Sequence, residues 1–214
     1  MLRTLSLALL SLTALASVGC KKEQHATLDD LHRYPMERAH VHYIYSGLGR
    51  GVEDLYFDHY GKREAKFANW QHLEDKGLRS TLTLTIANGP DIYMCLLDRG
   101  QGTHWKDPEL DSLFHLDAAN VPTPEMTTKG SLSTKGKIIR QDTVLGLTAD
   151  VWQMDDAPVQ LYIWRSVMLK RAVMAPGDTV VLTAASIDTT SQLSSKTFVV
   201  PSNVKMTERP APPL

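Results

Sequence analysis

The sequence is poor in net charge, in cysteine and in the motifs of catalysis. A formal net charge of -1 and the lack of any block of like charge argue against a nucleic-acid-binding protein. No Gly-x-Ser-x-Gly elbow is present, and no Ser, His and Asp can be placed on adjacent elements as a triad. Acidic pairs such as Asp155-Asp156 fall in predicted turns, which do not separate two pKa values as acid/base catalysis requires. We therefore expect no enzymatic activity and no cofactor.

The first twenty residues have the features of a lipoprotein signal. Arg3 precedes an apolar run from Leu5 to Val18 that is too short to span a bilayer comfortably. The run ends in Ala16-Ser17-Val18-Gly19-Cys20, which resembles a bacterial lipobox with Ser17 where Leu is commonest. We expect Cys20 to carry acyl chains such as palmitate and to anchor the protein in a membrane; a plain signal peptide cleaved nearby is the alternative. By family analogy, Lys21 after the cysteine favours the outer membrane of a bacterial cell envelope, facing the periplasm.

A lipidated Cys20 leaves Cys95 as the only thiol, so no intramolecular disulfide can form. Cys95 lies among apolar residues in the segment DIYMCLL. We expect it to be buried and unreactive, and a nucleophilic role is the less favoured alternative.

Alternating apolar and polar residues predict a mainly β protein with few helices. The pattern is clearest in residues 79–87, where aliphatic residues alternate with threonines, and in residues 159–164. Turn residues separate about ten such segments, and tight turns make sequential strands antiparallel neighbours. We expect a single antiparallel, strongly curved sheet, that is, an incomplete β-barrel.

Two segments predict helices. Residues 28–34 suit a short helix with Thr27 as its N-cap. Residues 108–119 suit a longer one, because Asp107 can cap it and Pro108 fits its first position. We expect the second helix to lie over the concave face of the sheet.

The predicted organisation is one domain with short flanking segments, since 43% hydrophobic and 22% charged residues are typical of a globular chain. We assign residues 1–19 to a lipoprotein signal peptide, 20–36 to a tether and short helix, 37–205 to a half-barrel domain, and 206–214 to a Pro-rich tail.

Scattered turn and strand residues resemble a group of bacterial lipoproteins of uncharacterised function. The group in turn resembles, in strand order, the periplasmic lipoprotein-localisation carriers and their outer-membrane receptor. That resemblance implies a half-barrel whose concave apolar face, closed by helices, holds acyl chains. The residues that carry it are Ser46-Gly47, Gly51, Leu55-Tyr56-Phe57-Asp58, Tyr60-Gly61-Lys62, Glu64-Ala65, Asp142-Thr143-Val144-Leu145-Gly146, Trp152, Val159–Trp164, Leu169-Lys170 and Phe198–Pro201.

A bound lipid, lipoprotein acyl chain or other hydrophobic molecule would need an aliphatic lining and a movable cover. Burial releases about 0.8 kcal/mol per CH₂ group, so even a shallow groove is useful. The alternative is that the same residues form an ordinary packed core. The candidate lining is Leu82, Leu84, Ile86, Val159, Leu161, Ile163, Val180 and Leu182, and the candidate cover is Leu110, Leu113 and Phe114.

Three aromatic residues suggest a second function. If Trp152, Tyr162 and Trp164 lie on the convex face, they form an exposed patch suited to a partner or to the membrane interface. The alternative function is therefore a non-enzymatic interaction or structural lipoprotein that binds an envelope protein through its outer face.

Histidines offer a weak metal site. His40 and His42 share one face of a strand, and His59 lies in the adjacent hairpin arm, next to Asp58. These side chains could bind zinc. A solvated strand face explains them more simply, so we expect no metal.

Overall fold

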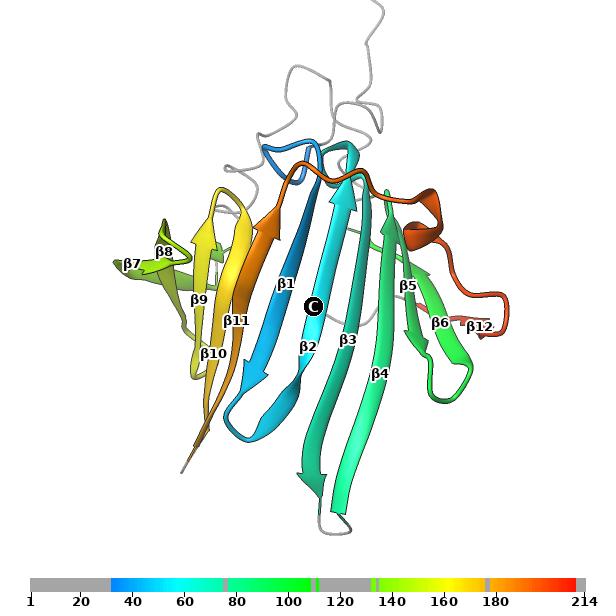
Figure 1. Cartoon of the computed structure of the whole chain (residues 1–214), viewed down its shortest axis with the longest axis horizontal. Coiled ribbons are helices and arrows are strands. Elements are labelled where there is room, and N and C mark those ends of the chain that lie inside the picture. The colour runs from blue at the N-terminus through cyan, green and yellow to red at the C-terminus, as the bar shows by residue number, and fades with distance from the viewer. Residues whose placement is uncertain are drawn as a thin grey trace, which may run out of the picture.

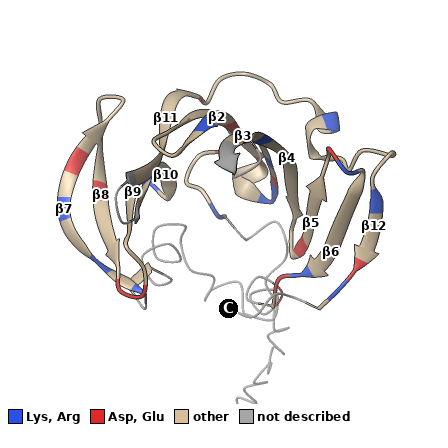
Figure 2. Ribbon diagram, turned by 90° about the horizontal axis from the view of Figure 1, so that it is seen from below, with Lys and Arg blue, Asp and Glu red and all other residues tan. Residues whose placement is uncertain are grey.

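The chain folds as one open β-sheet that curls strongly about its inner side (Figures 1 and 2). This computed structural model describes residues 32–74, 77–108, 111, 132–133, 135–175 and 178–210. Within them there is no helix of seven or more residues, and none long and apolar enough to cross a membrane. The elements are β1 (Ala39–Ser46), β2 (Gly49–Asp58), η1 (His59–Gly61), β3 (Arg63–Glu74), β4 (Gly77–Asn88), β5 (Asp91–Leu96), β6 (Gln101–Lys106), β7 (Gly136–Val144), β8 (Leu147–Met154), β9 (Val159–Trp164), β10 (Val167–Ala175), β11 (Asp178–Asp188), η3 (Ser195–Phe198) and β12 (Lys205–Glu208).

Two antiparallel meanders meet in the middle of the 12-stranded sheet, whose order is β12-β6-β5-β4-β3-β2-β1-β11-β10-β9-β8-β7. The meanders join where β1 pairs with β11, and β12 adds to the far edge parallel to β6. The predicted mainly β fold with one curved antiparallel sheet is confirmed, apart from this parallel edge strand. Neither the β1–β11 junction nor β12 follows from turn signals, because both depend on pairing between segments distant in sequence.

Cross-strand register defines the two faces of the sheet, since directly opposed residues point to the same side. The connection between β11 and β12 passes over the outer side of the curl in Figure 2 and packs Phe198 against Ala65 and Ile86. The rows of the opposite face therefore line the inside. One inner row is Val41, Leu55, Lys66, Thr85, Met94, Thr103 and Thr207; the next is Tyr43, Glu53, Ala68, Thr83, Leu96, Gln101 and Lys205.

Leu82, Leu84 and Ile86 were predicted to line the concave face, and that prediction is wrong. They alternate with Thr83 and Thr85 of the inner rows, so they point outward. Ile86 is fully buried and Leu84 is partly buried in the cluster around Phe198. The physical reason is that the β11–β12 connection covers this part of the outer face, which makes the outer face of β4 the drier one.

The alternation in β9 also has the opposite sense to the prediction. Tyr162 is 4% exposed and belongs to the main core cluster, and Trp164 packs against that cluster. Val159, Leu161 and Ile163 are only partly buried. Trp152 is 5% exposed. The three aromatic residues therefore do not form the exposed patch that the sequence suggested.

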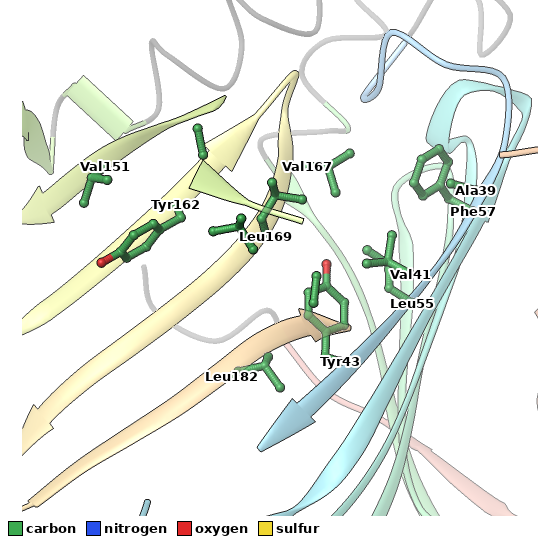
Figure 3. Packing of buried hydrophobic residues seen from close by; sticks show 13 residues of the cluster. Ala39, Val41, Tyr43, Leu55, Phe57, Val151, Tyr162, Val167, Leu169 and Leu182 are labelled. Carbon is green, nitrogen blue, oxygen red and sulfur yellow. The ribbon is translucent and has the colours of Figure 1, made fainter. Parts of the chain in front are cut away.

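The main core lies inside the curl on one half of the sheet, where it is formed by β1, β2 and β7 to β11. Figure 3 shows side chains from β1 and β2 gathered with side chains from β8 to β11. Tyr43 is 1% exposed, and its hydroxyl donates a 2.7 Å hydrogen bond to the carbonyl of Met168. Leu182 is also 1% exposed, whereas Val180 is partly buried. Here the alternative of an ordinary packed core describes the molecule better than an open hollow does.

Most of the predicted helix over the concave face lies outside the described residues. Leu110, Leu113 and Phe114 are among the residues not described. At its start, the Asp111 N–H donates to the Asp107 carbonyl at 2.9 Å. Of the short helix predicted at residues 28–34, only 32–34 are described, and none of these three is helical.

Candidate functional site

An open groove with a volume of about 680 Å³ runs over the inner face of β5, β6 and β12. This end of the sheet is the right-hand wall of the curl in Figure 2. The residues that line the groove are Met94, Leu96, Gln101, Gly102, Thr103, Lys205, Thr207 and Arg209.

Strand register explains why these residues share a surface. Met94, Thr103 and Thr207 are neighbours in one inner row. Leu96, Gln101 and Lys205 are neighbours in the next. Because side chains alternate along a strand, the residues between them point to the outer face. The groove is therefore a regular patch of sheet, with its two largest apolar side chains on β5 and its polar ones towards β12.

Arg209 closes the groove at the edge of the sheet. Its backbone N–H donates to the His104 carbonyl at 3.0 Å, which continues the pairing of β12 with β6. Its guanidinium lies 5.0 Å from the centre of the Trp105 ring, within the range of a cation–π contact. Trp105 stands opposite Ile92, so this contact adds an apolar wall beside Met94.

The groove combines apolar surface with positive charge. Among its described lining residues, Lys205 and Arg209 are cationic and none is acidic. The acidic residues of β5 and β12 point away: Glu208 stands opposite His104, and His104 Nε2 lies 3.0 Å from Asp91 Oδ1 on the outer face. Such a surface can hold an amphiphile, with its apolar part on Met94 and Leu96 and its polar part at β12.

A partly buried polar group lies where residues 32–38, which we term the strap, cross the inner face. The Tyr34 hydroxyl donates to Glu64 Oε2 at 2.7 Å, and Arg33 Nη1 lies 3.8 Å from the same oxygen. Burial alone would raise the pKa of the Glu64 carboxyl, but Arg33, Lys66 and the Tyr34 hydrogen bond outweigh burial and lower it. Burial and the neighbouring Glu64 charge raise the pKa of Tyr34 well above its usual value. This group fixes the strap on β3.

The structure separates the histidines proposed as a weak zinc site. His40 Nε2 and His42 Nδ1 lie 2.7 and 2.8 Å from the same oxygen of Asp54. His59 instead lies 3.1 Å from Asp58, whose carboxylate also pairs with Arg63. In the part of the chain that is described, no three His, Cys, Asp or Glu side chains form a group that could hold a metal.

Of the two cysteines, only Cys95 lies in the described part of the chain. Cys95 is 0% exposed, which confirms that it is buried, and burial raises the pKa of its thiol. Cys20 lies outside the described residues.

Sequence reasoning missed the groove because it placed the start of the Pro-rich tail at residue 206, within β12. Lys205 and Arg209 line a site only once β12 pairs with β6. Met94 and Leu96 alternate around Cys95 in one short segment, so a period-2 signal for them was present. What the segment alone lacks is any sign of which side faces inward.

Comparisons with known proteins leave the family open. No protein-family model and no curated protein sequence matches the chain. Among solved structures, an uncharacterized conserved protein from Thermus thermophilus is similar at 10% identity, covering 85% of this chain and 96% of that one, with a TM-score of 0.49. LprF from Mycobacterium bovis is similar at 12% identity, covering 71% of this chain and 85% of that one, with a TM-score of 0.33. At such identities and scores, neither structure indicates what this chain does.

Proposed function

We propose that the protein is a non-enzymatic lipoprotein of the bacterial envelope that binds a lipid, an acyl chain or another hydrophobic molecule in the groove on β5, β6 and β12. The exposure of the Met94 side chain is the observation that most supports this proposal. Met94 is a large apolar side chain on the inner face, yet it is 39% exposed in an open groove of about 680 Å³. An apolar ligand laid over Met94 and Leu96 would remove that surface from water, at about 25 cal/mol per Å².

A matched pair of variants tests the groove. Met94→Glu places a charge on its floor, whereas Met174→Glu places one on β10 at nearly the same exposure, 40% against 39%. We expect Met94→Glu to weaken binding of a fluorescent fatty acid at least about tenfold, since an unpaired charge opposes an apolar ligand. Met174→Glu should bind like the unmodified protein. Equal binding by both variants, with both folded by circular dichroism, would contradict the proposal.

The proposed anchor keeps the groove near a membrane. The stretch from Cys20 to His32 can extend at most about 40 Å, and from His32 onward the strap is fixed to the sheet. His32 stacks on Tyr60 at 4.1 Å between ring centroids, and the backbone N–H groups of Arg33 and Tyr34 donate to the Tyr60 carbonyl. In bacteria that produce the full chain, Cys20→Ser should move the protein into the soluble fraction. Retention in the membrane fraction would contradict lipidation at Cys20.

A further inference from the structure

We infer that the groove selects an anionic amphiphile, a molecule with an acyl-type tail and a carboxylate or phosphate head, with the head held by Lys205 and Arg209. This inference rests on the proposed function and adds the chemical class of the ligand.

Charge complementarity is the first support. Lys205 and Arg209 both line the groove, both are exposed, and no described lining residue is acidic. The protein as a whole has a net charge of -1, so the two cations of this lining do not simply reflect a basic chain. A negative head placed there would meet two cations whose charge no side chain of the described lining already offsets.

The arrangement of the residues along the sheet gives the ligand a direction. Lys205 stands in register with Gln101 and Leu96, and Thr207 stands in register with Thr103 and Met94. Neighbouring strands lie about 4.8 Å apart, so the β12 side chains are roughly 10 Å from the apolar ones on β5. A head at β12 and a tail over β5 fit that separation. Thr103 and Gln101, between them, can donate hydrogen bonds to head-group oxygens.

Arg209 is held in place for this role. Its guanidinium lies over the Trp105 ring at 5.0 Å, while its backbone is bonded to the His104 carbonyl. A guanidinium in a cation–π contact still has N–H groups to donate, and these can bind a carboxylate or phosphate through two parallel hydrogen bonds. Less side-chain freedom is then lost when the anion binds.

The test compares two ligands that share a tail. Dodecanoate and dodecanol are titrated at pH 7.5 into the mature soluble domain, with the Cys20→Ser change, and binding is measured by calorimetry. We expect dodecanoate to bind at least about tenfold more tightly, since each tenfold is 1.4 kcal/mol. The double variant Lys205→Gln/Arg209→Gln should lose this preference and bind both ligands similarly. The control Lys137→Gln/Lys196→Gln removes two exposed cations from β7 and η3 and should keep the preference.

The outcomes separate the two proposals. If the unmodified protein binds both ligands equally, or if the control loses the preference as fully as the groove variant, the inferred selectivity is overturned while hydrophobic binding stands. If neither ligand binds, both proposals are overturned. A comparison of dodecanoate with dodecyl phosphate then shows which head is preferred, and a preference that weakens as salt is raised would support the ionic contact.

Discussion

The Tyr34 hydroxyl donates a 2.7 Å hydrogen bond to the Glu64 carboxylate, across 30 residues of sequence. The Tyr34 ring also stacks on Phe57 with 3.9 Å between centroids. Two contacts of different kinds therefore hold the strap on the inner face of β2 and β3. The strap directly follows the proposed tether in sequence, so these contacts mark the point at which the described chain joins the sheet.

Removing the Tyr34 hydroxyl should destabilise the domain. Tyr34→Phe keeps the stacking on Phe57 but leaves the Glu64 carboxylate with one hydrogen-bond donor fewer, and we expect a loss of about 1–3 kcal/mol in the free energy of unfolding. Urea denaturation measures it. Tyr93→Phe is the control, because that ring stacks on His104 and packs beside the Phe198 cluster, while no hydrogen bond of its hydroxyl is found among the described residues. Equal losses in the two variants would show that the Tyr34–Glu64 hydrogen bond contributes nothing specific.

Glu64 should make the domain sensitive to acid. Its pKa is lowered in the folded state, because Arg33, Lys66 and the Tyr34 hydroxyl outweigh the effect of burial. A carboxyl with a lowered folded pKa stabilises the fold above its unfolded pKa, near 4.3, and this contribution is lost as the pH falls through the folded pKa. Glu64→Gln should be less stable at pH 7 and should lose less further stability on acidification. Parallel pH profiles of unfolding for the two proteins would contradict this role.

Gly61 should tolerate no side chain. Its φ is +88°, and a Cβ there would lie 2.6 Å from Tyr34 Cδ2 and 2.8 Å from Arg33 Cβ. Gly146 is a matched control, since its φ is +77° and no described atom lies within 4 Å of its added Cβ. We expect Gly146→Ala to cost about 1 kcal/mol of left-handed backbone strain. Gly61→Ala should cost about 1–3 kcal/mol more, because the strap must move. Equal thermal unfolding of the two variants would show that the strap adapts freely.

Cys95 should react with thiol reagents only when the domain unfolds. The side chain is 0% exposed, and burial raises the pKa of its thiol, so little thiolate is present at neutral pH. In the Cys20→Ser protein, labelling at pH 7.5 should be slow in buffer and fast in urea. Fast labelling in buffer would indicate that β5 opens, and the groove on its inner face would then also be open to rearrangement.

Period-2 patterning was enough to predict strands and a curved sheet, but it left the direction of each face undetermined. The aliphatic row of β4, formed by Leu82, Leu84 and Ile86, has the pattern of residues that face a core. It does face one, the cluster around Phe198, but this cluster lies on the outer face under the β11–β12 connection. The choice between Leu84 inward and Thr85 inward depends on where residues 189–204 run, more than a hundred residues away. No local pattern encodes that.

Predicting the groove from the sequence would have required knowledge of the same kind of distant contact. β12 follows a long connection and pairs in parallel with β6, so Lys205 and Arg209 reach the site from a segment that resembles a polar tail. The β9 segment was predicted as a strand, since PVQLYIWR combines alternation with β-branched and aromatic residues, and a strand is observed at Val159–Trp164. Its aromatic row is the buried one because Tyr162 and Trp164 fill volume in the main core that the smaller aliphatic residues would leave empty.

Photolabelling tests the central claim, that a hydrophobic ligand lies on the inner face of β5, β6 and β12. A fatty acid with a diazirine near the end of its tail is bound to the mature domain, irradiated, and located by mass spectrometry of peptides. We expect the label on the segment 91–106 around Met94 and Leu96, and its loss in Met94→Glu but not in Met174→Glu. Label on β7 to β10 or on the outer face, or no saturable label at all, would contradict the claim.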